Sequence, residues 1–301
     1  METSILTLIS LDICGSILVT GAAGFVGRAV AGVLRSKGLR VVTHARRAAP
    51  DIDWAADLGG LVAVSRPIPS DISAVVHCAA AIPARSVAFV RDNSAATAQL
   101  AAMLAEISSL KCVVHISSMA VYERPKSGPW IISEDADVVN VGDPGTEPYA
   151  GSKRASELAL SELMHRGVKV THLRASSIYG PGMAHTTLLP VLVARALRHD
   201  PLQLLGPRNY TQNFVHVLDV AELTAALVVE GCPVSAVNGF SDDTFGLLAL
   251  AEMIRTRLTS RSDMIDGTQD VDLAAPVFVN MVAKRLCPTF RRLADNLFDA
   301  A

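Results

Sequence analysis

The chain lacks several features that would assign it to a class at once. Of its 301 residues, aromatic side chains make up 5% and charged ones 19%, and 27 Lys and Arg nearly balance 29 Asp and Glu. The sequence has no basic block of the kind that binds nucleic acid. No run approaches the ~20 apolar residues that a membrane span needs. We therefore expect neither a nucleic-acid partner nor a membrane.

Cysteine is also scarce and never paired in a motif. The five cysteines are scattered singly, with no C-x-x-C and no metal-ligand spacing: Cys14, Cys78, Cys112, Cys232 and Cys287. An odd, dispersed set is typical of reduced thiols in a cytosolic protein. The first 14 residues are mildly apolar but contain Glu2 and Asp12 and no Lys or Arg, which makes a poor signal peptide. We expect a cytoplasmic protein without a metal site.

What the sequence does contain is an alternation of strand and helix patterns. Half of the residues are hydrophobic, enough for a sizeable core. Short β-rich runs precede helical patterns such as 92–107, which predicts a parallel sheet covered by helices. The expected strands are residues 17–20, 40–46, 74–80, 112–118 and 168–180. The predicted fold class is α/β, a Rossmann-type doubly wound parallel sheet with a smaller C-terminal substrate lobe.

The pattern loosens after residue 180, and this suggests how the chain is divided. We predict a dinucleotide-binding domain over 1–180, to which 211–240 returns. A smaller substrate-binding lobe would comprise 181–210 and 241–301. The sequence has no internal repeat, low-complexity tract or linker, so the two parts are expected to form one unit.

The stretch "TGAAGFVG" carries the first chemical signal. Gly21, Gly24 and Gly27 directly follow a strand and open a helix. A tight turn and the close approach of backbone to phosphate both require missing side chains, and a helix N-terminus presents free N–H groups to a pyrophosphate. In this context the triplet predicts a dinucleotide site.

The end of the second strand bears on which dinucleotide binds. An acid there would accept hydrogen bonds from the adenosine ribose, whereas an arginine would pair with a 2′-phosphate. The strand runs into Arg46 and Arg47, with no acid before Asp51. One interpretation is a solvated loop. We favour the other, in which these arginines select NADP over NAD.

Tyr149 and Lys153 share one helical face because they are four residues apart. An ammonium one turn away favours a phenolate. Such a tyrosine can exchange a proton with a substrate hydroxyl while hydride moves to or from a nicotinamide. Ser118 stands at the C-terminal end of a strand, where open α/β sheets bind ligands, and could hydrogen-bond the same substrate oxygen.

Together these motifs resemble the extended short-chain dehydrogenase/reductase family, which contains sugar-nucleotide epimerases, dehydratases and ketoreductases. The ordered set covers nearly the whole chain: "TGAAGFVG", "AADL" (55–58), "VVHCAA" (75–80), Asn93 in "DNSAAT", "ISSMAVY" (116–122), "YAGSK" (149–153), "LRASSIYGPG" (173–182) and "NFVHVLDVAEL" (213–223). Each piece is common alone, but their order is highly specific.

The resemblance implies a role for each matching residue. Tyr149 would be the acid/base, Ser118 would polarise the substrate oxygen, and Lys153 would tune Tyr149 and bind the nicotinamide ribose. Asp57 and Leu58 would flank the adenine, and Asn93 would tie the central strands together. The implied cofactor-binding set is Gly21, Ala23, Gly24, Phe25, Val26, Gly27, Arg46, Asp57, Leu58, Ala79, Ala80, Asn93, Ser117, Tyr149 and Lys153.

The sequence also departs from the family pattern. Dehydratases usually place Asp-Glu after this serine, but Met119 and Ala120 stand there, which disfavours dehydration. The substrate-binding candidates are Ser118, Ser177, Arg208 and Gln212. Ser177 and Gln212 occupy positions where UDP-hexose epimerases often carry Asn and Arg. A cation that would pair with phosphate is thus missing unless Arg208 replaces it.

The leading hypothesis is an NAD(P)-dependent enzyme that transfers hydride at a sugar carbon of a nucleotide sugar, as an epimerase or a 4-ketoreductase. The alternative is an NADPH-dependent reductase of a non-nucleotide ketone or aldehyde. A non-catalytic dinucleotide-binding regulator is less favoured, since Tyr149 and Lys153 are both present. Alanine-rich helices over 92–107 and 149–165 further predict a homodimer.

Other polar residues in these motifs have structural interpretations. His77, His115 and His216 are expected to be core histidines satisfied by backbone groups. Asp219 is expected to cap the helix that follows it, because an acid suits a helix N-terminus.

Overall fold

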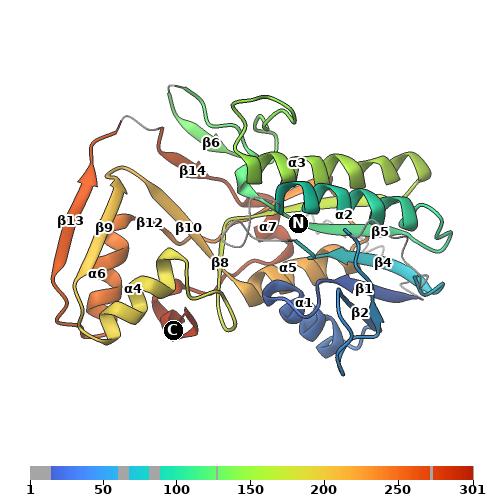
Figure 1. Cartoon of the computed structure of the whole chain (residues 1–301), viewed down its shortest axis with the longest axis horizontal. Helices are drawn as coiled ribbons and strands as arrows, with labels where there is room; N and C mark the ends of the chain where they lie inside the picture. Colours follow the sequence, from blue (N-terminus) through green and yellow to red (C-terminus); the bar gives the residue numbers. More distant parts are fainter. Residues whose placement is uncertain (1–14, 60–67, 81–88, 127, 272–273, 301) are drawn as a thin grey trace, which may run out of the picture.

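The computed structural model describes residues 15–59, 68–80, 89–126, 128–271 and 274–300. Its centre is a parallel sheet of seven strands in the order β11-β7-β5-β4-β1-β2-β3 (Figure 1). Those strands are β1 (Ser16–Thr20), β2 (Val41–Ala45), β3 (Trp54–Ala55), β4 (Ile72–His77), β5 (Cys112–Ser118), β7 (Lys169–Ala175) and β11 (Ala236–Gly239). The predicted doubly wound α/β fold is confirmed.

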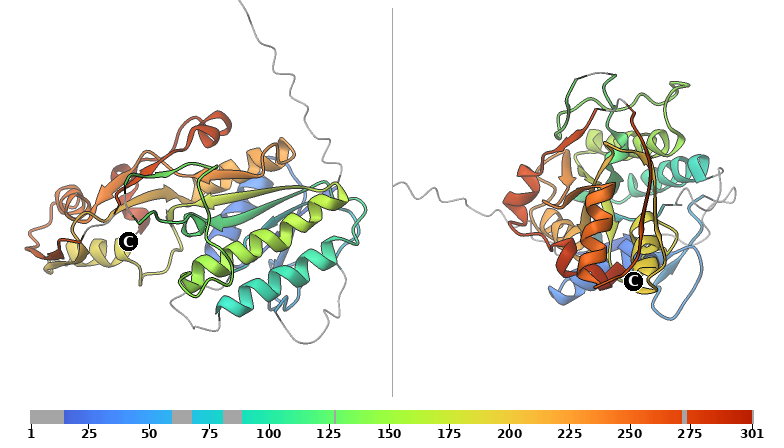
Figure 2. Two further views of the ribbon diagram at one scale, coloured as in Figure 1. Left: turned by 90° about the horizontal axis from the view of Figure 1, so that it is seen from above. Right: turned by 90° about the vertical axis from the view of Figure 1, so that its left-hand side faces the viewer.

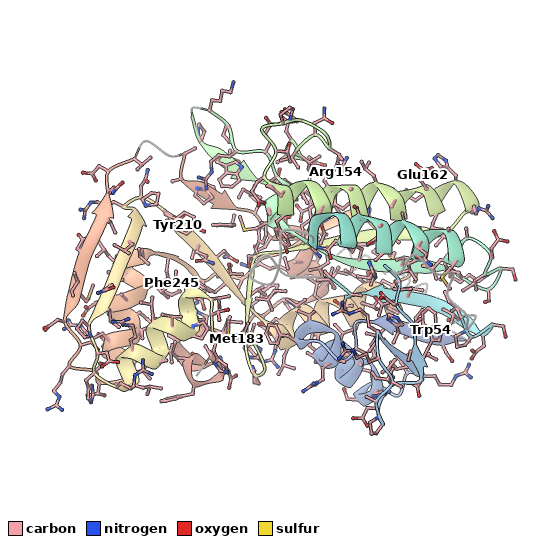
Figure 3. All side chains as sticks on the ribbon, in the orientation of Figure 1. Trp54, Arg154, Glu162, Met183, Tyr210 and Phe245 are labelled. Carbon is pink, nitrogen blue, oxygen red and sulfur yellow. The ribbon has the colours of Figure 1, made fainter. Side chains whose placement is uncertain are left out.

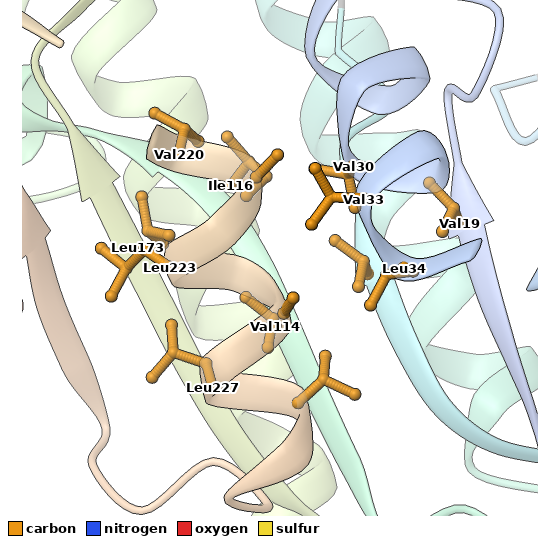
Figure 4. Packing of buried hydrophobic residues seen from close by; sticks show 14 of the residues in the cluster. Val19, Val30, Val33, Leu34, Val114, Ile116, Leu173, Val220, Leu223 and Leu227 are labelled. Atoms are coloured by element: carbon orange, nitrogen blue, oxygen red, sulfur yellow. The ribbon is translucent and has the colours of Figure 1, made fainter. Parts of the chain in front are cut away.

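One face of this sheet is covered by α1 (Phe25–Ser36) and α5 (Val217–Val229). Figure 4 shows the packing: α1 contributes Val30, Val33 and Leu34, and α5 contributes Val220, Leu223 and Leu227. They pack on side chains that alternate along the strands, as a two-sided sheet requires.

The other face is covered by α2 (Phe89–Leu104) and α3 (Pro148–Ser161), which lie side by side (Figure 2). A second core forms beneath them, with Leu100 and Leu104 of α2 and Leu160 of α3 fully buried. A layer of helices therefore covers each face, and the carboxyl ends of the strands remain at one edge.

The rest of the chain forms small sheets and helices at that edge. These elements are β6 (Trp130–Ile132), β8 (Ser177–Tyr179), α4 (Leu188–Leu197), β9 (Leu202–Pro207), β10 (Thr211–His216), β12 (Thr244–Gly246), α6 (Leu247–Arg257), β13 (Met264–Gln269) and β14 (Pro276–Phe278). Helix α7 (Met281–Leu286) instead packs beside α5 and β11 of the large sheet. Strand β10 lies between β8 and β12, β9 pairs with β13, and β6 pairs with β14. A third core, around Leu192, Leu202 and Leu250, packs α4, β9 and α6 together, and a separate one, around Trp130 and Ile132, lies at β6 and β14.

The expected strand 168–180 is in fact two strands in different sheets. β11 ends at Gly239, opposite Ala175, and the Ser176 N–H makes a last bond to the Gly239 carbonyl over 3.2 Å. After Ser176 the backbone turns away, and β8 pairs with β10 instead. Helix α5 and strand β11 then return to the large sheet. The proposed division at residues 180, 210 and 240 stays a prediction.

Candidate active site

The glycine turn has a steric reason at each of its positions. Gly21 has φ of +68°, and a Cβ there would lie 2.8 Å from the backbone of Ala79. Gly24 is the N-cap of α1, and a Cβ there would lie 3.1 Å from the Gly21 carbonyl oxygen, to which the Gly24 N–H donates over 2.8 Å. A Cβ on Gly27 would lie 2.2 Å from the same oxygen. Bare backbone therefore forms a cradle that fits a dinucleotide pyrophosphate.

The first turn of α1 is open toward this cradle. Ala23 and Gly24 are exposed, and Phe25 and Val26 are half-buried. The first N–H groups of a helix have no acceptor within it, and no side chain caps this end among the described residues. An anion is the natural partner of such a helix end.

The end of β2 places two cations in solvent. Arg46 and Arg47 are exposed, directly after the buried His44. Nε2 of His44 lies 2.9 Å from the Ala56 carbonyl, and its ring lies 4.6 Å from that of Trp54. Burial, partly opposed by the Ala56 contact and the Asp57 charge, lowers the pKa of His44, so this ring is neutral. The arginines therefore carry the positive charge at this strand end.

The remaining predicted cofactor residues differ in accessibility. Asp57 is exposed, and one of its oxygens accepts from the N–H of Gly59 over 3.1 Å. Leu58 is buried in the core beneath α2. Ala79 lies against Gly21, and Ala80 is exposed. Of these four residues, Asp57 and the two alanines thus have surfaces open to a ligand, and Leu58 does not.

Helix α3 begins in a way that fixes Tyr149. Pro148 occupies the first turn, and the carboxylate of Glu147 caps it by accepting from the Ala150 N–H over 2.9 Å. Tyr149 is half-buried, one turn before Lys153, which is 6% exposed. The ammonium of Lys153 donates to the Ile116 carbonyl over 2.9 Å, so the predicted Tyr–Lys face of α3 lies against β5.

The two neighbouring serines of β5 have different partners. Ser118 is half-buried and caps the short turn Met119–Val121, its oxygen accepting from the Ala120 N–H over 3.2 Å. Its own proton can therefore be donated to a ligand. Ser117 is buried and donates to Glu157 over 2.7 Å. The structure thus directs the hydroxyl of Ser117, a predicted cofactor residue, at helix α3.

A buried ion pair beneath this site was not predicted from the sequence. Glu157 and Arg174 form two hydrogen bonds of 3.0 Å. The available signal was the spacing of Tyr149, Lys153 and Glu157, which repeats every four residues and places all three on one helical face. Spacing gives the face of the helix but does not identify the partner on β7.

A row of polar residues also crosses the sheet beneath α2 and α3. Thr20, His77, His115 and His172 are register partners on β1, β4, β5 and β7, and all are buried. The Nδ1 of His77 lies 2.7 Å from the Thr20 hydroxyl, and its Nε2 lies 3.0 Å from that of Thr97. The expectation that backbone groups satisfy His77 was therefore wrong, because threonines on β1 and α2 do so.

Helix α2 supports this row. Thr97 also donates to the carbonyl of Asn93 over 2.9 Å, and Asn93 is 6% exposed. Burial, and to a lesser extent the charge of Lys153 and the neighbouring His44, lowers the pKa of His77 to about 3. The histidine under the site is therefore neutral and adds no charge beneath Lys153.

Two expectations for the later motif also differ from the structure. His216, not Asp219, caps α5, its Nδ1 accepting from the Leu218 N–H over 3.1 Å. The Nε2 of His216 lies 3.0 Å from the Asp299 carboxylate. Asp219 stands in the first turn, but its carboxylate bonds Arg291. The predicted cap was wrong because a long-range cation binds that acid instead.

The predicted substrate residues are only partly brought together. Gln212 donates its side-chain amide to the hydroxyl of Ser177, and both are half-buried. Arg208 lies elsewhere, beyond β9, where it pairs with Asp266 at 2.9 Å and with Asp270 at 3.0 Å. Its charge is thus already matched by two carboxylates.

The two halves of the molecule meet near the glycine turn. A Cβ on Gly182 would lie 3.9 Å from the ring of Phe25. Next to it is a hollow of about 300 Å³, lined by residues 180–183, His185, Phe298 and Asp299. Figure 3 places Met183 between the large sheet and the smaller half that contains Tyr210 and Phe245. A ligand at the turn would therefore border both halves.

The described part of the chain also lacks a metal cluster and a membrane-spanning helix. There, no three His, Cys, Asp or Glu side chains are grouped to hold a metal ion. No helix in those segments has the length and apolar character to cross a bilayer.

Comparisons with known proteins agree with this geometry. A dTDP-4-dehydro-6-deoxy-D-allose reductase of Streptomyces bikiniensis is 25% identical over 79% of this chain and 80% of its own. A UDP-glucose 4-epimerase of Azospirillum brasilense is 29% identical over 68% of this chain and 66% of its own. The solved structure of MoeE5 with UDP-glucose and NAD is 25% identical, has a TM-score of 0.76, and aligns over 95% of this chain and 97% of its own.

A sequence profile settles the family. The profile of the NAD dependent epimerase/dehydratase family matches residues 17–235, from strand β1 to the start of β11. This span contains the glycine turn, Ser118, Tyr149 and Lys153. The protein is thus an enzyme of the extended short-chain dehydrogenase/reductase type, and it belongs to the NAD-dependent epimerase/dehydratase family.

Proposed function

We propose that this enzyme transfers hydride at a sugar carbon of a nucleotide sugar, as an epimerase or a 4-ketoreductase. The observation that carries the proposal is the contact between Lys153 and the Ile116 carbonyl. It attaches the face of α3 that bears Tyr149 to the strand end that bears Ser118. The relatives that are a 4-ketoreductase and a UDP-glucose 4-epimerase support the same class of reaction.

The proposed roles follow from the contacts of each side chain. Tyr149 accepts the proton of a sugar hydroxyl on oxidation and returns it on reduction. Ser118 donates a hydrogen bond to the same oxygen, because its oxygen only accepts from the Ala120 N–H and that bond does not use its proton. Lys153 supplies a buried positive charge one turn from Tyr149. A bound nicotinamide dinucleotide supplies the hydride acceptor or donor.

The glycine turn would hold the pyrophosphate, and Arg46 with Arg47 would hold a 2′-phosphate. Both arginines are exposed at the end of β2, where a cation favours NADP. The MoeE5 structure contains bound NAD, which supports a dinucleotide site at this position of the fold. The preference for NAD or NADP in this protein would then depend on Arg46 and Arg47. We infer a preference for NADP.

A second candidate function is the reduction of a non-nucleotide ketone or aldehyde. It is favoured by the hydrogen bond between Gln212 and Ser177. Both side chains are neutral and would hydrogen-bond a hydroxyl or carbonyl group of the substrate. A diphosphate would be bound better by a cation, and the nearest predicted one, Arg208, is paired with two aspartates.

A product assay decides between these functions. The enzyme is incubated with UDP-glucose, UDP-glucuronic acid or a dTDP-4-keto-6-deoxyhexose, with NAD, NADP, NADH or NADPH in turn. Inversion at one carbon without net cofactor consumption indicates an epimerase, and one-to-one reduction indicates a ketoreductase. Oxidation of NADPH only by non-nucleotide ketones or aldehydes would overturn the first proposal and support the second.

We further infer a symmetric homodimer formed through α2 and α3. Ala95, Ala98 and Ala102 lie exposed along α2, and Leu158 of α3 is 45% exposed. Because these helices lie side by side, their outer faces form one surface of small and apolar side chains.

We also infer a cytoplasmic location, because Cys78, Cys112, Cys232 and Cys287 are free thiols.

A further inference from the structure

Glu157 is a fully buried carboxylate with four hydrogen bonds from protein groups. It accepts from the Ser117 hydroxyl over 2.7 Å, from the Arg154 guanidinium over 3.0 Å, and twice from Arg174 over 3.0 Å. Burial acts to raise the pKa of Glu157, but the bonds and charges of Arg174, with smaller help from His172 and Ser117, outweigh it and hold the pKa below its usual range. The carboxylate is therefore ionised in the core.

Such a pair is a poor source of stability. Removing two charges from water costs several kcal/mol per ion in typical cases, and mutual attraction repays this only partly. The geometry that the pair imposes is the more informative property. A buried carboxylate whose two oxygens both accept hydrogen bonds cannot rotate or shift without losing some of them, and water cannot replace the lost bonds there.

The bonds of Glu157 join α3 to the strand end that carries Ser118. Lys153 donates to the carbonyl of Ile116, and Glu157, one turn later, accepts from Ser117. Consecutive turns of α3 are thus attached to consecutive residues of β5. Two such points fix both the rotation of the helix about its axis and its position along the strand.

The partner of Glu157 on β7 is itself immobilised. Arg174 is the register partner of Ser117, so neighbouring strands direct their donors at one carboxylate. The Arg174 guanidinium lies 4.9 Å from the centre of the Tyr122 ring and donates to the Glu134 carbonyl over 3.4 Å. The acceptor on α3 therefore meets a rigid pair of donors on the sheet.

We propose that Glu157 is a positioning residue, which holds the Tyr149–Lys153 face of α3 in register with Ser118. The inference rests on the proposed catalytic roles of those three residues. Glu157 acts through protein contacts alone. Its loss should therefore misalign the proton-transfer groups and slow turnover, while substrate binding is largely retained.

The test removes one hydrogen bond of Glu157 without changing the charge of any residue in the buried cluster. Glu157→Gln would leave Arg174 buried beside a neutral amide and could unfold the protein, so Ser117→Ala is the informative variant. Ser156→Ala is its matched control, because Ser156 is buried on α3 and donates only to the Ser152 carbonyl. Both variants lose one buried hydroxyl, and thermal unfolding measures the cost of each.

We expect Ser117→Ala to lower kcat about tenfold with KM changed less than twofold, whereas Ser156→Ala changes neither beyond twofold. The substrate is whichever nucleotide sugar or ketone of the assay above turns over. Equal kcat values in the two variants would overturn the proposal. So would weaker NADP binding with normal kcat, because Ser117 would then be a cofactor ligand.

A double variant separates this proposal from the proposed function. If Glu157 acts through Tyr149, adding Ser117→Ala to Tyr149→Phe should cause no further loss of residual single-turnover rate. A further tenfold loss in that background would show an independent role and overturn the inference. Full activity of Tyr149→Phe alone would instead reject the proposed mechanism.

Hydrogen exchange gives a readout that needs no turnover. Amides of residues 147–153 should exchange about tenfold faster in Ser117→Ala than in Ser156→Ala, because one of the two points that hold α3 on β5 is lost and only the Lys153 contact remains. Identical exchange in this segment would contradict positioning, whatever the activity.

Discussion

The ammonium of Lys153 lies 2.9 Å from the carbonyl oxygen of Ile116, two residues before Ser118. The helix that bears Tyr149, the proposed proton donor, is thereby attached to the strand that bears Ser118, which is proposed to hydrogen-bond the same substrate oxygen. The contact uses a backbone carbonyl, which no side-chain substitution on β5 can remove. The position of Tyr149 thus depends on α3 and on the side chains that anchor it.

The first prediction concerns Tyr149 itself. Tyr149→Phe removes one oxygen from a half-buried ring, so folding and cofactor binding should be nearly intact. Turnover should fall by about 10² or more, the typical effect of losing a general acid/base. Steady-state kinetics measures this, with Tyr210→Phe as control, because that ring is exposed at 38% outside the large sheet. Near-normal turnover would remove Tyr149 from the mechanism.

Two glycines of helix α1 provide an internal contrast. A Cβ on Gly27 would lie 2.2 Å from the Gly21 carbonyl, a backbone atom that cannot move aside cheaply. Gly27→Ala should therefore cost about 1–3 kcal/mol of unfolding free energy and weaken dinucleotide binding at least about tenfold.

Gly32 supplies the matched control on the same helix. A Cβ there meets nothing within 4 Å, so Gly32→Ala should stabilise the protein by about 0.5–1 kcal/mol and leave binding unchanged. Chemical denaturation and cofactor titration measure both variants. Equal effects at the two sites would mean that the turn is not packed as described.

These cases show what the sequence could and could not predict. The glycine turn and the Tyr149–Lys153 pair depend on spacings within one strand–turn–helix or one helix, and both are local. Apart from Arg154, the partners of Glu157 and Arg208 lie 17 to 62 residues away, and helical periodicity carries no information about those distant partners. Asp219 is an example of a prediction that failed for this reason. Its place in the first turn of α5 favours a helix cap, but the distant Arg291 binds its carboxylate.

The cofactor prediction concerns Arg46 and Arg47. Wild-type enzyme should bind NADPH more tightly than NADH, and Arg46→Ala/Arg47→Ala should lose about tenfold or more in NADPH affinity with little change for NADH. Fluorescence titration with both cofactors measures this. Arg261→Ala, at an exposed arginine distant in the chain, is the control. A wild-type preference for NADH that the double variant leaves unchanged would show that these arginines are only surface charges.

The assembly prediction concerns Ala102, which is exposed on α2. If α2 and α3 form the dimer interface, Ala102→Glu places an unpaired charge in it and should convert the dimer to monomer. Light scattering at micromolar concentration measures the mass. Thr256→Glu, on the exposed face of α6, should leave the dimer intact. A monomeric wild-type protein would refute the prediction.

The last prediction concerns pH and the buried histidines beneath the site. Burial is the main cause that lowers the pKa of His77 to about 3, of His172 to about 4, and of His115 well below its usual value. The charge of Lys153 also lowers the pKa of His77 and His115, whereas at His172 the charge of Glu157 partly opposes the effect of burial. All three rings are therefore neutral in the folded protein at pH 5 to 7.

In the unfolded chain each ring binds a proton as pH falls below about 6.5. Between pH 7 and 5 the unfolded state thus gains protons that the folded state does not, and the free energy of unfolding must decrease. Each histidine contributes up to about 1.4 kcal/mol per pH unit. This stability is fully present above pH 6.5 and is lost progressively toward the folded pKa values.

Urea unfolding at pH 7, 6 and 5 measures this slope, in a window above the titration of ordinary carboxylates. His115→Gln should reduce the slope by up to about 1.4 kcal/mol per pH unit, with the full effect toward pH 5, because up to one proton fewer is bound on unfolding. His165→Gln should leave it unchanged, since the His165 side chain is 80% exposed in the folded protein. Equal slopes in wild type and His115→Gln would mean that His115 is protonated to the same extent in both states, contrary to its burial between β4 and β7.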